Sequence, residues 1–303
     1  MTAVRDSLGR GAAFLLNGQD ADGGWRDFDL RPGVSTSWTT AYVAARVADL
    51  ADIVPAAATA AAAGERFLWS NRKAGGGWAY NARCPADADS TALALLFLGR
   101  RAPPRGLKDA AVLAAFQHPD GGFATYRPWR ADHGWARPHA EVTATALRAL
   151  ALFLPSDHWV RRCGLAWLVG RAAQPAPATY WWATGAYLKL ELARLGLAVA
   201  GEAAADADNA GAFASALDLE RAVLSGAGPG AIESATQNLI ARQCADGGWP
   251  SEPILRLPDP AAAPEAADAR ADSLHADQNR LFTTATALSA LKAARRSAVT
   301  DPP

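Results

Sequence analysis

A short turn recurs four times along the chain, and it constrains the fold more than any other feature. Each copy places two glycines directly before an aromatic residue, and three of the four copies begin with Gln. The copies occupy residues 19–25, 73–78, 117–123 and 243–249. An apolar helical pattern precedes each copy, and a second apolar helix rich in Thr, Ala and Leu follows after a variable loop. The repeating unit is therefore helix, glycine turn, loop and helix.

The spacing of the turns is typical of stacked helical hairpins. The turn aromatics stand at positions 25, 78, 123 and 249, which are 53, 45 and 126 residues apart, and a degenerate copy of the second helix at residues 180–188 falls in the long gap. Hairpin repeats of this period bury a face against their neighbours. We expect an all-α protein, a closed α/α barrel (toroid) of five to six hairpins that forms a single domain over residues 1–303. An open solenoid is the alternative.

Composition limits the classes of function. Thirty basic and thirty acidic residues give a formal net charge of zero, which lacks the electrostatic signature of a general nucleic-acid binder. Cys84, Cys163 and Cys244 form no CxxC pair, which argues against a disulfide framework and favours a reducing compartment. With no signal-peptide core and no run of eighteen apolar residues, we expect a cytoplasmic protein, and peripheral membrane contact stays open.

Two carboxylates stand at the start of one predicted inner helix, in the segment Asp87-Ala88-Asp89-Ser90-Thr91-Ala92. Burial and a second carboxylate nearby both raise the pKa of an aspartic acid, so this placement favours acid catalysis. The alternative is that Asp89 or Ser90 only caps the helix, because a side-chain oxygen there satisfies free backbone N–H groups.

These motifs resemble those of triterpene cyclases and related class II terpene cyclases, including squalene-hopene cyclases. The family's Gln-x-x-x-Gly-x-Trp-like signature is matched at residues 19–25, 117–123 and 243–249, and its Asp-x-Asp-Asp-Thr-Ala motif at residues 87–92. The resemblance covers nearly the whole chain as one catalytic barrel. It implies that Asp89 is the proton donor, with Asp87 beside it, and that Ser90 replaces the third aspartate.

The departures from the family pattern bear on the substrate. Oxidosqualene cyclases also lack the third carboxylate and protonate an epoxide, so Ser90 favours an epoxide or an electron-rich alkene. Squalene-hopene cyclases place a histidine four residues after an aspartate in a later segment, whereas this chain has Thr145 four residues after Glu141. His139 precedes Glu141 by two residues and is a candidate substitute, so both join the catalytic candidates.

Aromatic side chains stabilise carbocations by cation–π attraction without trapping them. Those on predicted inner helices or the loops that feed them are Trp38, Tyr80, Trp129, Trp135, Trp181, Trp182, Tyr187 and Phe282. For any single one, ordinary core packing is the simpler interpretation. Three arginines in the loop 126–139, namely Arg127, Arg130 and Arg137, are candidates for holding a diphosphate or another anionic group at the pocket mouth, and solvated surface charge is an equal alternative.

No cofactor is expected from the sequence. His133 and His139 lack Cys or carboxylate partners at metal-ligand spacing, and Mg²⁺ would be needed only for a diphosphate substrate. Residues 244–275 lack the Asp-x-Cys element of the zinc site in protein prenyltransferases. The Pro/Ala/Asp-rich run 257–278 is interpreted as a solvated linker, with a cover over the pocket mouth as the alternative.

The first hypothesis is a class II terpene cyclase (an isomerase) in which Asp89 protonates an alkene or epoxide in the prenyl chain of a terpenoid or meroterpenoid. Its partner would be a small isoprenoid substrate. The second hypothesis is an α/α-barrel glycosidase or lyase that uses Asp89 and Glu141 as its acid pair. The third is a non-catalytic barrel that binds an isoprenoid or a protein.

Overall fold

The structure is a computed structural model that describes residues 2–101, 103–127, 133–173, 179–197, 211–261 and 274–300. Trp129 and Arg130 lie outside these ranges. Helices dominate the described chain, and they are α1 (Thr2–Asn17), α2 (Ser37–Asp49), α3 (Ala56–Ser70), α4 (Ala88–Leu98), α5 (Pro103–Ala114), α6 (Ala140–Leu150), α7 (Trp159–Ala172), α8 (Ala186–Arg194), α9 (Ala212–Leu224), α10 (Pro229–Ala241) and α11 (Leu281–Thr300). None of them is both long and apolar enough to cross a membrane.

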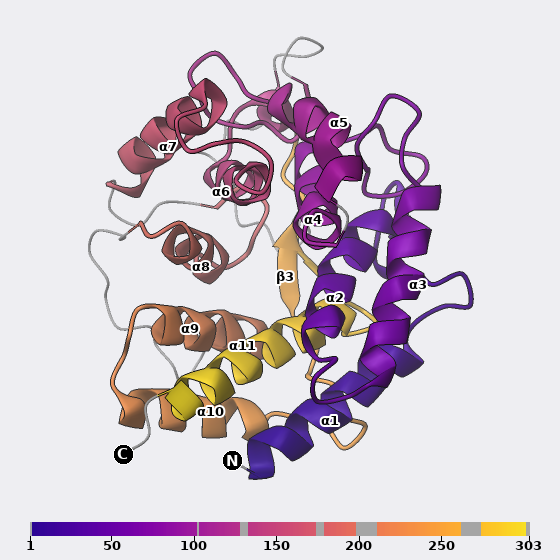
Figure 1. The fold of residues 1–303 in the computed structure, drawn as a ribbon, viewed down its shortest axis with the longest axis vertical. Helices are drawn as coiled ribbons and strands as arrows, with labels where there is room; N and C mark the ends of the chain where they lie inside the picture. Colours follow the sequence, from indigo (N-terminus) through magenta and orange to yellow (C-terminus); the bar gives the residue numbers. More distant parts are fainter. Residues whose placement is uncertain are drawn as a thin grey trace.

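The helices form two concentric layers around a closed ring (Figure 1). In the inner layer α2, α4, α6, α8, α9 and α11 follow one another, each packed on the next, and α11 closes the ring by packing on α2. The outer layer places α3 on α2, α5 on α4, α7 on α6, α10 on α9 and α1 on α11. The all-α closed barrel is confirmed, and the open solenoid is excluded because the last inner helix contacts the first.

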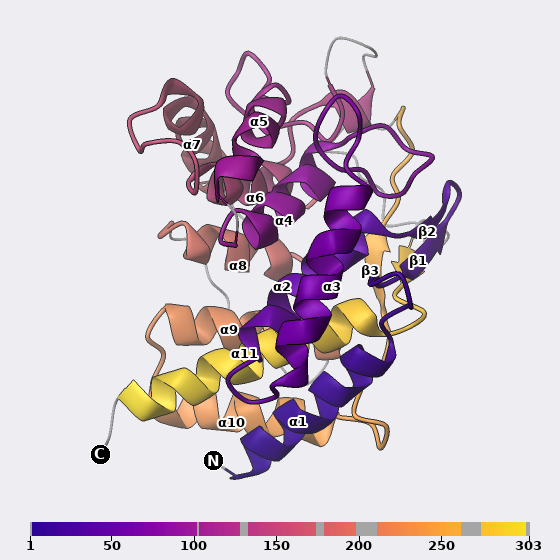
Figure 2. The ribbon, with the colours of Figure 1, turned by 45° about the vertical axis from the view of Figure 1, so that its right-hand side comes forward.

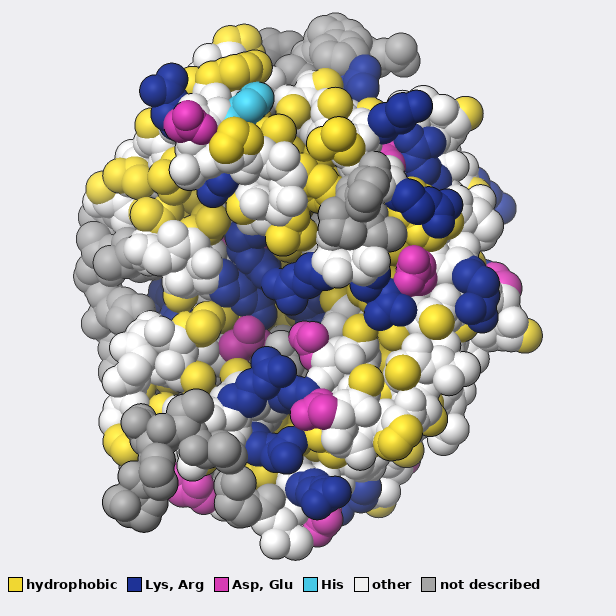
Figure 3. Space-filling model, in the orientation of Figure 1, with side chains coloured by type: hydrophobic (Ala, Val, Ile, Leu, Met, Phe, Trp, Pro, Cys, Tyr) yellow, Lys and Arg dark blue, Asp and Glu magenta, His cyan; other side chains and the backbone are white. Residues whose placement is uncertain are grey.

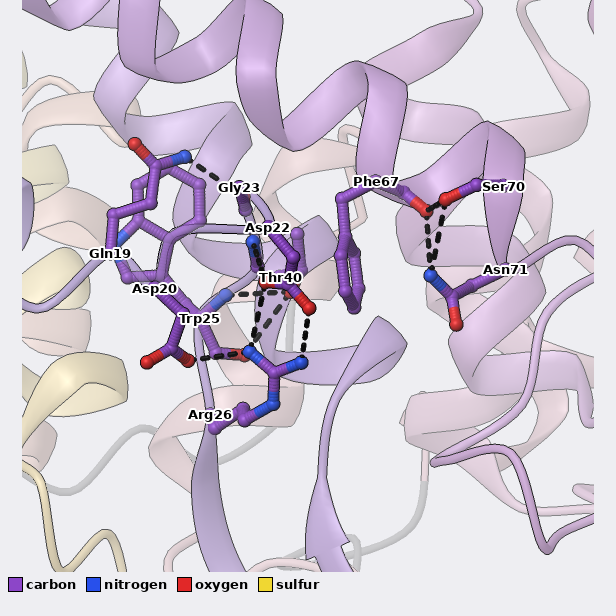
Figure 4. Close-up of polar contacts among 11 residues, drawn as sticks. Gln19, Asp20, Asp22, Gly23, Trp25, Arg26, Thr40, Phe67, Ser70 and Asn71 are labelled. Atoms are coloured by element: carbon purple, nitrogen blue, oxygen red, sulfur yellow. Dashed lines mark hydrogen bonds and ion pairs between the residues drawn. The ribbon is translucent and has the colours of Figure 1, made fainter.

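The glycine turns attach each hairpin to the next. In the first turn Gly23 has a φ of 90°, and a Cβ there would lie 2.6 Å from the carbonyl oxygen of Ala63 on α3. Only glycine tolerates both the backbone conformation and the contact. The Gln19 amide donates to the Gly23 oxygen at 2.8 Å and to the Ala60 oxygen, also on α3, at 2.9 Å (Figure 4). The Gln and Gly residues that recur in the turn therefore join it to the neighbouring outer helix.

The turn also fixes the inner helix of its own hairpin. The Trp25 indole N–H donates to the Leu15 oxygen at 2.8 Å, and the Trp25 backbone N–H donates to the Thr40 hydroxyl on α2 at 2.9 Å. Because each Thr side chain receives the turn's backbone N–H, the Thr-rich starts of the inner helices have a structural cause. The same backbone bond recurs from Trp78 to Thr91, from Phe123 to Thr143 and from Trp249 to Thr284.

Two short antiparallel ribbons interrupt the helical pattern, and the sequence did not predict them. They are β1 (Asp27–Leu30) with β2 (Gly33–Ser35), and β3 (Pro253–Arg256) with β4 (Leu274–Ala276). Figure 2 shows β1, β2 and β3 near one another at one edge of the barrel, and β1 contacts β4. Both ribbons lie in connections that lead from an outer to an inner helix, so they wall the end of the barrel where the inner helices begin.

The expected helical copy at residues 180–188 is only partly helical. Helix α8 begins at Ala186, and the preceding aromatic residues form an irregular segment in which Trp182 bridges Leu255. The reason is local: the segment pairs with β3, where the Ala183 N–H donates to the Ile254 oxygen at 3.0 Å and so leaves the helical hydrogen-bond pattern.

The opposite end of the barrel, where the inner helices end, is basic. Figure 3 shows Lys and Arg side chains gathered around a hollow at the centre of the face it presents. Cations at helix C-termini offset the partial negative charge of the unsatisfied carbonyl groups. Buried Glu191 also pairs with two of them, Arg148 at 2.5 Å and Arg194 at 2.6 Å. The arginines lining this hollow are Arg46, Arg100, Arg148 and Arg194.

Closure of the ring gives the first prediction. Gly247 has a φ of 93°, and a Cβ there would lie 2.5 Å from the Arg10 carbonyl oxygen on α1. The replacement Gly247→Ala should lower the free energy of unfolding by at least about 2 kcal/mol, because a left-handed alanine alone costs roughly 1–2 kcal/mol. Denaturant unfolding measures this. Gly170→Ala, in an open position on α7, is the control and should be neutral or slightly stabilising; equal effects of the two would contradict the docking role.

Candidate active site

A cavity of about 840 Å³ opens at the end of the barrel where the inner helices begin. This volume lies in the upper part of the range of roughly 300–1,000 Å³ found for ligand pockets. The starts of α2, α4 and α6 form one side, and β3 with residues 257–260 forms the other. The beginning of the Pro/Ala/Asp-rich run therefore lines the cavity instead of being a solvated linker, while residues 262–273 lie outside the described chain. The predicted site residues that line the cavity are Trp38, Tyr80, Asp87, Asp89, Ser90, Trp135, Glu141, Trp181 and Trp182.

Asp87, and not Asp89 or Ser90, is the N-cap of α4. Its Oδ1 accepts the Ser90 backbone N–H at 2.7 Å, and its Oδ2 accepts the Ser90 hydroxyl at 2.8 Å and the Tyr80 backbone N–H at 3.0 Å. Burial raises the pKa of Asp87 to about 6, against the opposing effect of these three donors. Three hydrogen bonds to the charged form make Asp87 the carboxylate best able to hold a negative charge here.

Asp89 differs from Asp87 in its surroundings, although both begin the same helix. The Asp89 Oδ2 accepts a hydrogen bond from the Trp38 indole N–H at 2.5 Å, and Asp89 lines the cavity. Burial, followed by the charge of Asp87, raises the pKa of Asp89 to about 7. When two coupled carboxyl groups differ in this way, the proton is favoured on the group whose charged form accepts fewer hydrogen bonds. These surroundings favour the proton on Asp89 and the negative charge on Asp87.

Ser90 occupies the position of the third aspartate in the family motif, and its side chain has a defined task. Both its backbone N–H and its hydroxyl donate to Asp87. A third carboxylate at this position could not donate in the ionised form, whereas the hydroxyl supports the charge on Asp87. Ser90 therefore supports the charged form of Asp87, and this charge contributes to the raised pKa of Asp89.

Glu141 and His139 lie at the start of α6 but have different environments. Glu141 lines the cavity, and burial raises its pKa. His139 is not among the lining residues: its ring stacks on Tyr180 with 4.0 Å between centroids, and its Nε2 lies 2.9 Å from the Gly134 oxygen. Burial lowers the pKa of His139 to about 3, so the imidazole is neutral near pH 7. The structure therefore does not bring His139 into the acid group.

The aromatic candidates form two groups, those that line the cavity wall and those that lie behind the lining residues. Of those that the structure describes, Tyr187 and Phe282 lie behind the lining residues instead of among them. Phe282 stacks on Trp38 with 4.8 Å between ring centroids, and Tyr187 stacks on Trp182 at 4.1 Å. The wall rings are consequently held in fixed positions by a second row of rings. Sequence analysis missed Tyr126, which lines the cavity and follows the third glycine turn.

The arginines at the cavity differ from the predicted cluster. Neither Arg127 nor Arg137 is a lining residue, and Arg127 lies over the Phe116 ring instead. The lining arginines are Arg31, Arg83 and Arg256, which come from the β1–β2 turn, the loop before α4 and β3. These positions are far apart in the sequence and carry no local motif, so only the ring closure reveals them. No group of three or more His, Cys, Asp or Glu residues suited to a metal ion occurs among the described residues.

The sequence matches no family model and no curated protein. Solved structures do match. A protein from Actinoplanes has 29% sequence identity and a TM-score of 0.82, over 96% of this chain and 99% of the other. The type II terpene cyclase MstE from Scytonema, in its apo form, has 24% identity and a TM-score of 0.81, over 98% and 100%. This chain has the fold of a type II terpene cyclase.

A third match describes the ligand of that neighbour. An Asp-to-Asn variant of MstE in complex with geranylgeranyl dihydroxybenzoate, its substrate, has 25% identity and a TM-score of 0.78 over 97% of this chain and 98% of the other. The type II terpene cyclase fold thus agrees with the family that the motifs at residues 19–25, 87–92, 117–123 and 243–249 resemble.

The raised pKa of Asp89 predicts how stability depends on pH. Since the folded protein binds this proton more tightly than the unfolded chain does, with a pKa near 7 against about 3.9, the free energy of unfolding falls as pH rises from about 4 to about 7. That contribution is absent above both pKa values. The variant Asp89→Asn carries no such charge, so it should melt at a higher temperature than the wild type at pH 8.

This difference should shrink as the pH falls toward 4, where the wild-type carboxyl group is neutral in both states. Thermal unfolding between pH 4 and pH 8 measures it. Asp259→Asn, which alters an exposed carboxylate at the cavity, is the control. A constant difference for Asp89→Asn at every pH would show that the carboxyl group ionises without penalty in the folded protein.

Proposed function

We propose that the protein catalyses the proton-initiated cyclisation of a prenyl chain, with Asp89 as the acid. The observation that carries the proposal is that Asp89, with its pKa raised to about 7, faces a cavity walled by indole and phenol rings. An acid of this strength is protonated when substrate arrives near neutral pH and can still donate its proton. The similarity to MstE supports a cyclase role.

Charge placement supports the first step. When Asp89 transfers its proton to an alkene or epoxide carbon or oxygen, its new negative charge lies in the first turn of α4, where backbone N–H groups and the helix dipole stabilise an anion. Trp38 continues to donate to the resulting carboxylate. Asp87 holds its charge throughout through its three hydrogen bonds and needs no proton of its own.

The aromatic wall supports the intermediate steps. The positive charge formed on the prenyl chain moves from carbon to carbon as rings close, and aromatic faces attract it without forming a bond. Trp38 contacts Asp89. Tyr80 and Trp182 lie beside Trp38, and Trp135 with Trp181 forms another part of the cavity wall. A proton enters at the start and a proton leaves at the end, so the reaction is an isomerisation that needs no redox cofactor.

The arginines support a substrate with an anionic head group. Arg31 and Arg83 are exposed and line the cavity together with Arg256, whose Nε is buried without a hydrogen-bond partner in the described structure. A guanidinium group binds carboxylates and phosphates through paired N–H donors. A prenylated aromatic acid, such as the geranylgeranyl dihydroxybenzoate bound by MstE, fits this combination of an apolar wall and a basic mouth.

Turnover of a substrate panel tests the proposal. Geranylgeranyl dihydroxybenzoate, its terminal epoxide, geranylgeranyl diphosphate and squalene should be incubated with the protein and the products separated by mass and chromatography. We expect isomeric cyclic products from a prenyl substrate with a head group and none from squalene. Asp89→Asn should lower turnover by at least about 10³-fold, because general acid catalysis contributes roughly 10²–10⁴ and no alkene reacts without it. Unchanged product formation by this variant would exclude Asp89 as the acid.

The pH dependence of kcat/KM tests the two carboxylates separately. Activity requires protonated Asp89, so it should fall as pH rises through about 7. In Asp87→Asn the neighbouring charge is gone, which lowers the pKa of Asp89 and moves this decline to lower pH. Glu233→Gln, which alters an exposed carboxylate on α10 away from the cavity, should leave the profile in place. A decline at the same pH in wild type and Asp87→Asn would show that the two carboxyl groups do not interact.

A further inference from the structure

The two carboxylate oxygens of Glu141 have unequal environments. The side chain is 2% exposed, and its Oε1 accepts the backbone N–H groups of Tyr180 at 2.7 Å and Trp181 at 2.8 Å. Its Oε2 is fully buried and has no hydrogen-bond partner within the described chain. Glu141 thus fixes the irregular segment before α8 with one oxygen and leaves the other without a partner, and the residue is one of those that line the cavity.

A buried oxygen without a hydrogen-bond partner lowers the stability of the folded protein. Leaving a buried polar group without a partner costs about 1–3 kcal/mol, and more for a charged group. Oε1 alone would suffice for the structural task of holding residues 180 and 181. An amide side chain could perform that task without a charge, so the structure carries a carboxylate where its own hydrogen bonds do not require one.

We propose that the Glu141 carboxylate is the base that ends the cyclisation. In the last step, Oε2 takes a proton from the carbon next to the final cationic carbon, and the C–H electron pair becomes the new C=C bond. Asp89 has already given one proton to the substrate, so one proton enters and one leaves. The proton on Glu141 passes to solvent, and Asp89 is reprotonated from solvent, before the next turnover. This inference rests on the proposed function and assigns its final step.

The positions of the two carboxyl groups suit opposite ends of one reaction. Asp89 belongs to α4 and Glu141 to α6, so the proton donor and the proton acceptor stand on neighbouring inner helices around the same cavity. Ring closure moves the positive charge away from the carbon that was protonated. A base on a different helix from the acid can meet that charge where it finally resides.

Other groups near the cavity are less suited to the role. Both oxygens of Asp87 accept hydrogen bonds, three in all. His139 stacks on Tyr180 and is not among the residues that line the cavity. Burial raises the pKa of Glu141 and so makes the carboxylate more basic, while the backbone N–H groups of Trp181 and Tyr180, and then the Arg256 guanidinium, oppose this rise. A basic carboxylate with a free oxygen is what a terminal deprotonation requires.

The variant Glu141→Gln separates the chemical role from the structural one. The amide oxygen of glutamine can accept the same two N–H groups from Tyr180 and Trp181, but the amide nitrogen cannot take a proton. With geranylgeranyl dihydroxybenzoate, or whichever panel substrate the wild type cyclises, we expect consumption to stay within about tenfold of wild type. The wild-type alkene should fall at least tenfold as a fraction of product, in favour of hydroxylated products or other alkene isomers. Glu233→Gln, which alters an exposed carboxylate on the outer helix α10 away from the cavity, should leave the product ratio unchanged. An unaltered ratio in Glu141→Gln would overturn the assignment.

A binding measurement makes the test independent of turnover. N-Geranylpiperidine, which is protonated at pH 8, imitates a cyclic carbocation, and geranylcyclohexane is its neutral counterpart. Calorimetry should show binding of the amine to Glu141→Gln at least tenfold weaker than to wild type, with equal binding of the hydrocarbon. Glu141→Asp keeps the charge one methylene further back and should be intermediate. Equal affinity of the amine for wild type and Glu141→Gln would also overturn the assignment.

The outcomes distinguish the two proposals. If the wild type turns over no panel substrate, the proposed function fails, whereas loss of amine binding in Glu141→Gln would still show a cation-directed carboxylate at this wall. If the wild type cyclises a substrate and Glu141→Gln gives the same product ratio, the proposed function stands and the base is another group.

Discussion

The hydrogen bond between a glycine turn and the threonine of the following inner helix is the interaction on which the rest of the structure depends. At the second turn, the Trp78 N–H donates to the Thr91 hydroxyl at 3.0 Å, and the Asp87 N–H donates to the Trp78 oxygen at 3.0 Å. These bonds fix where α4 begins and how it is rotated. Since Asp87 and Asp89 occupy its N-cap and first turn, the same interaction that assembles the hairpin also orients the carboxyl groups.

The electrostatics of the cavity follow from that placement. A helix N-terminus favours an anion, whereas burial disfavours one. The two aspartates differ in how their surroundings balance these opposing effects. Asp87 accepts three hydrogen bonds that favour its charged form, while burial and the charge of Asp87 raise the pKa of Asp89 to about 7. Ser90 contributes to this division by donating to Asp87. Burial and one neighbouring charge thus keep the Asp89 carboxyl group protonated at higher pH than in water, at a cost in stability above neutral pH.

The family motif revealed the carboxylates, and the turn pattern revealed the barrel, because both depend on residues adjacent in sequence. Asp87, Asp89 and Ser90 share one helix start, and the threonines recur at fixed places after each turn. Other site residues depend on distant contacts. Arg256 reaches the cavity because β3 pairs with the segment at Trp182, and Arg127 points to Phe116 although it belongs to a loop beside the site. No local sequence pattern distinguishes an arginine that lines the cavity, such as Arg256, from one that packs on an aromatic ring, such as Arg127.

The sequence by itself determined the all-α hairpin repeat and the pair of aspartates, since helical periodicity, glycine turns and helix-start motifs are encoded over a few residues. The contact between α11 and α2 decided between the expected closed barrel and an open solenoid. Only the tertiary structure decided which ring lines the cavity and which lies behind it, as Trp182 and Tyr187 show. It also decided that Asp87 is the cap and that one oxygen of Glu141 is unpartnered. The physical reason is that burial, partner geometry and pKa arise from groups that meet only when the ring closes.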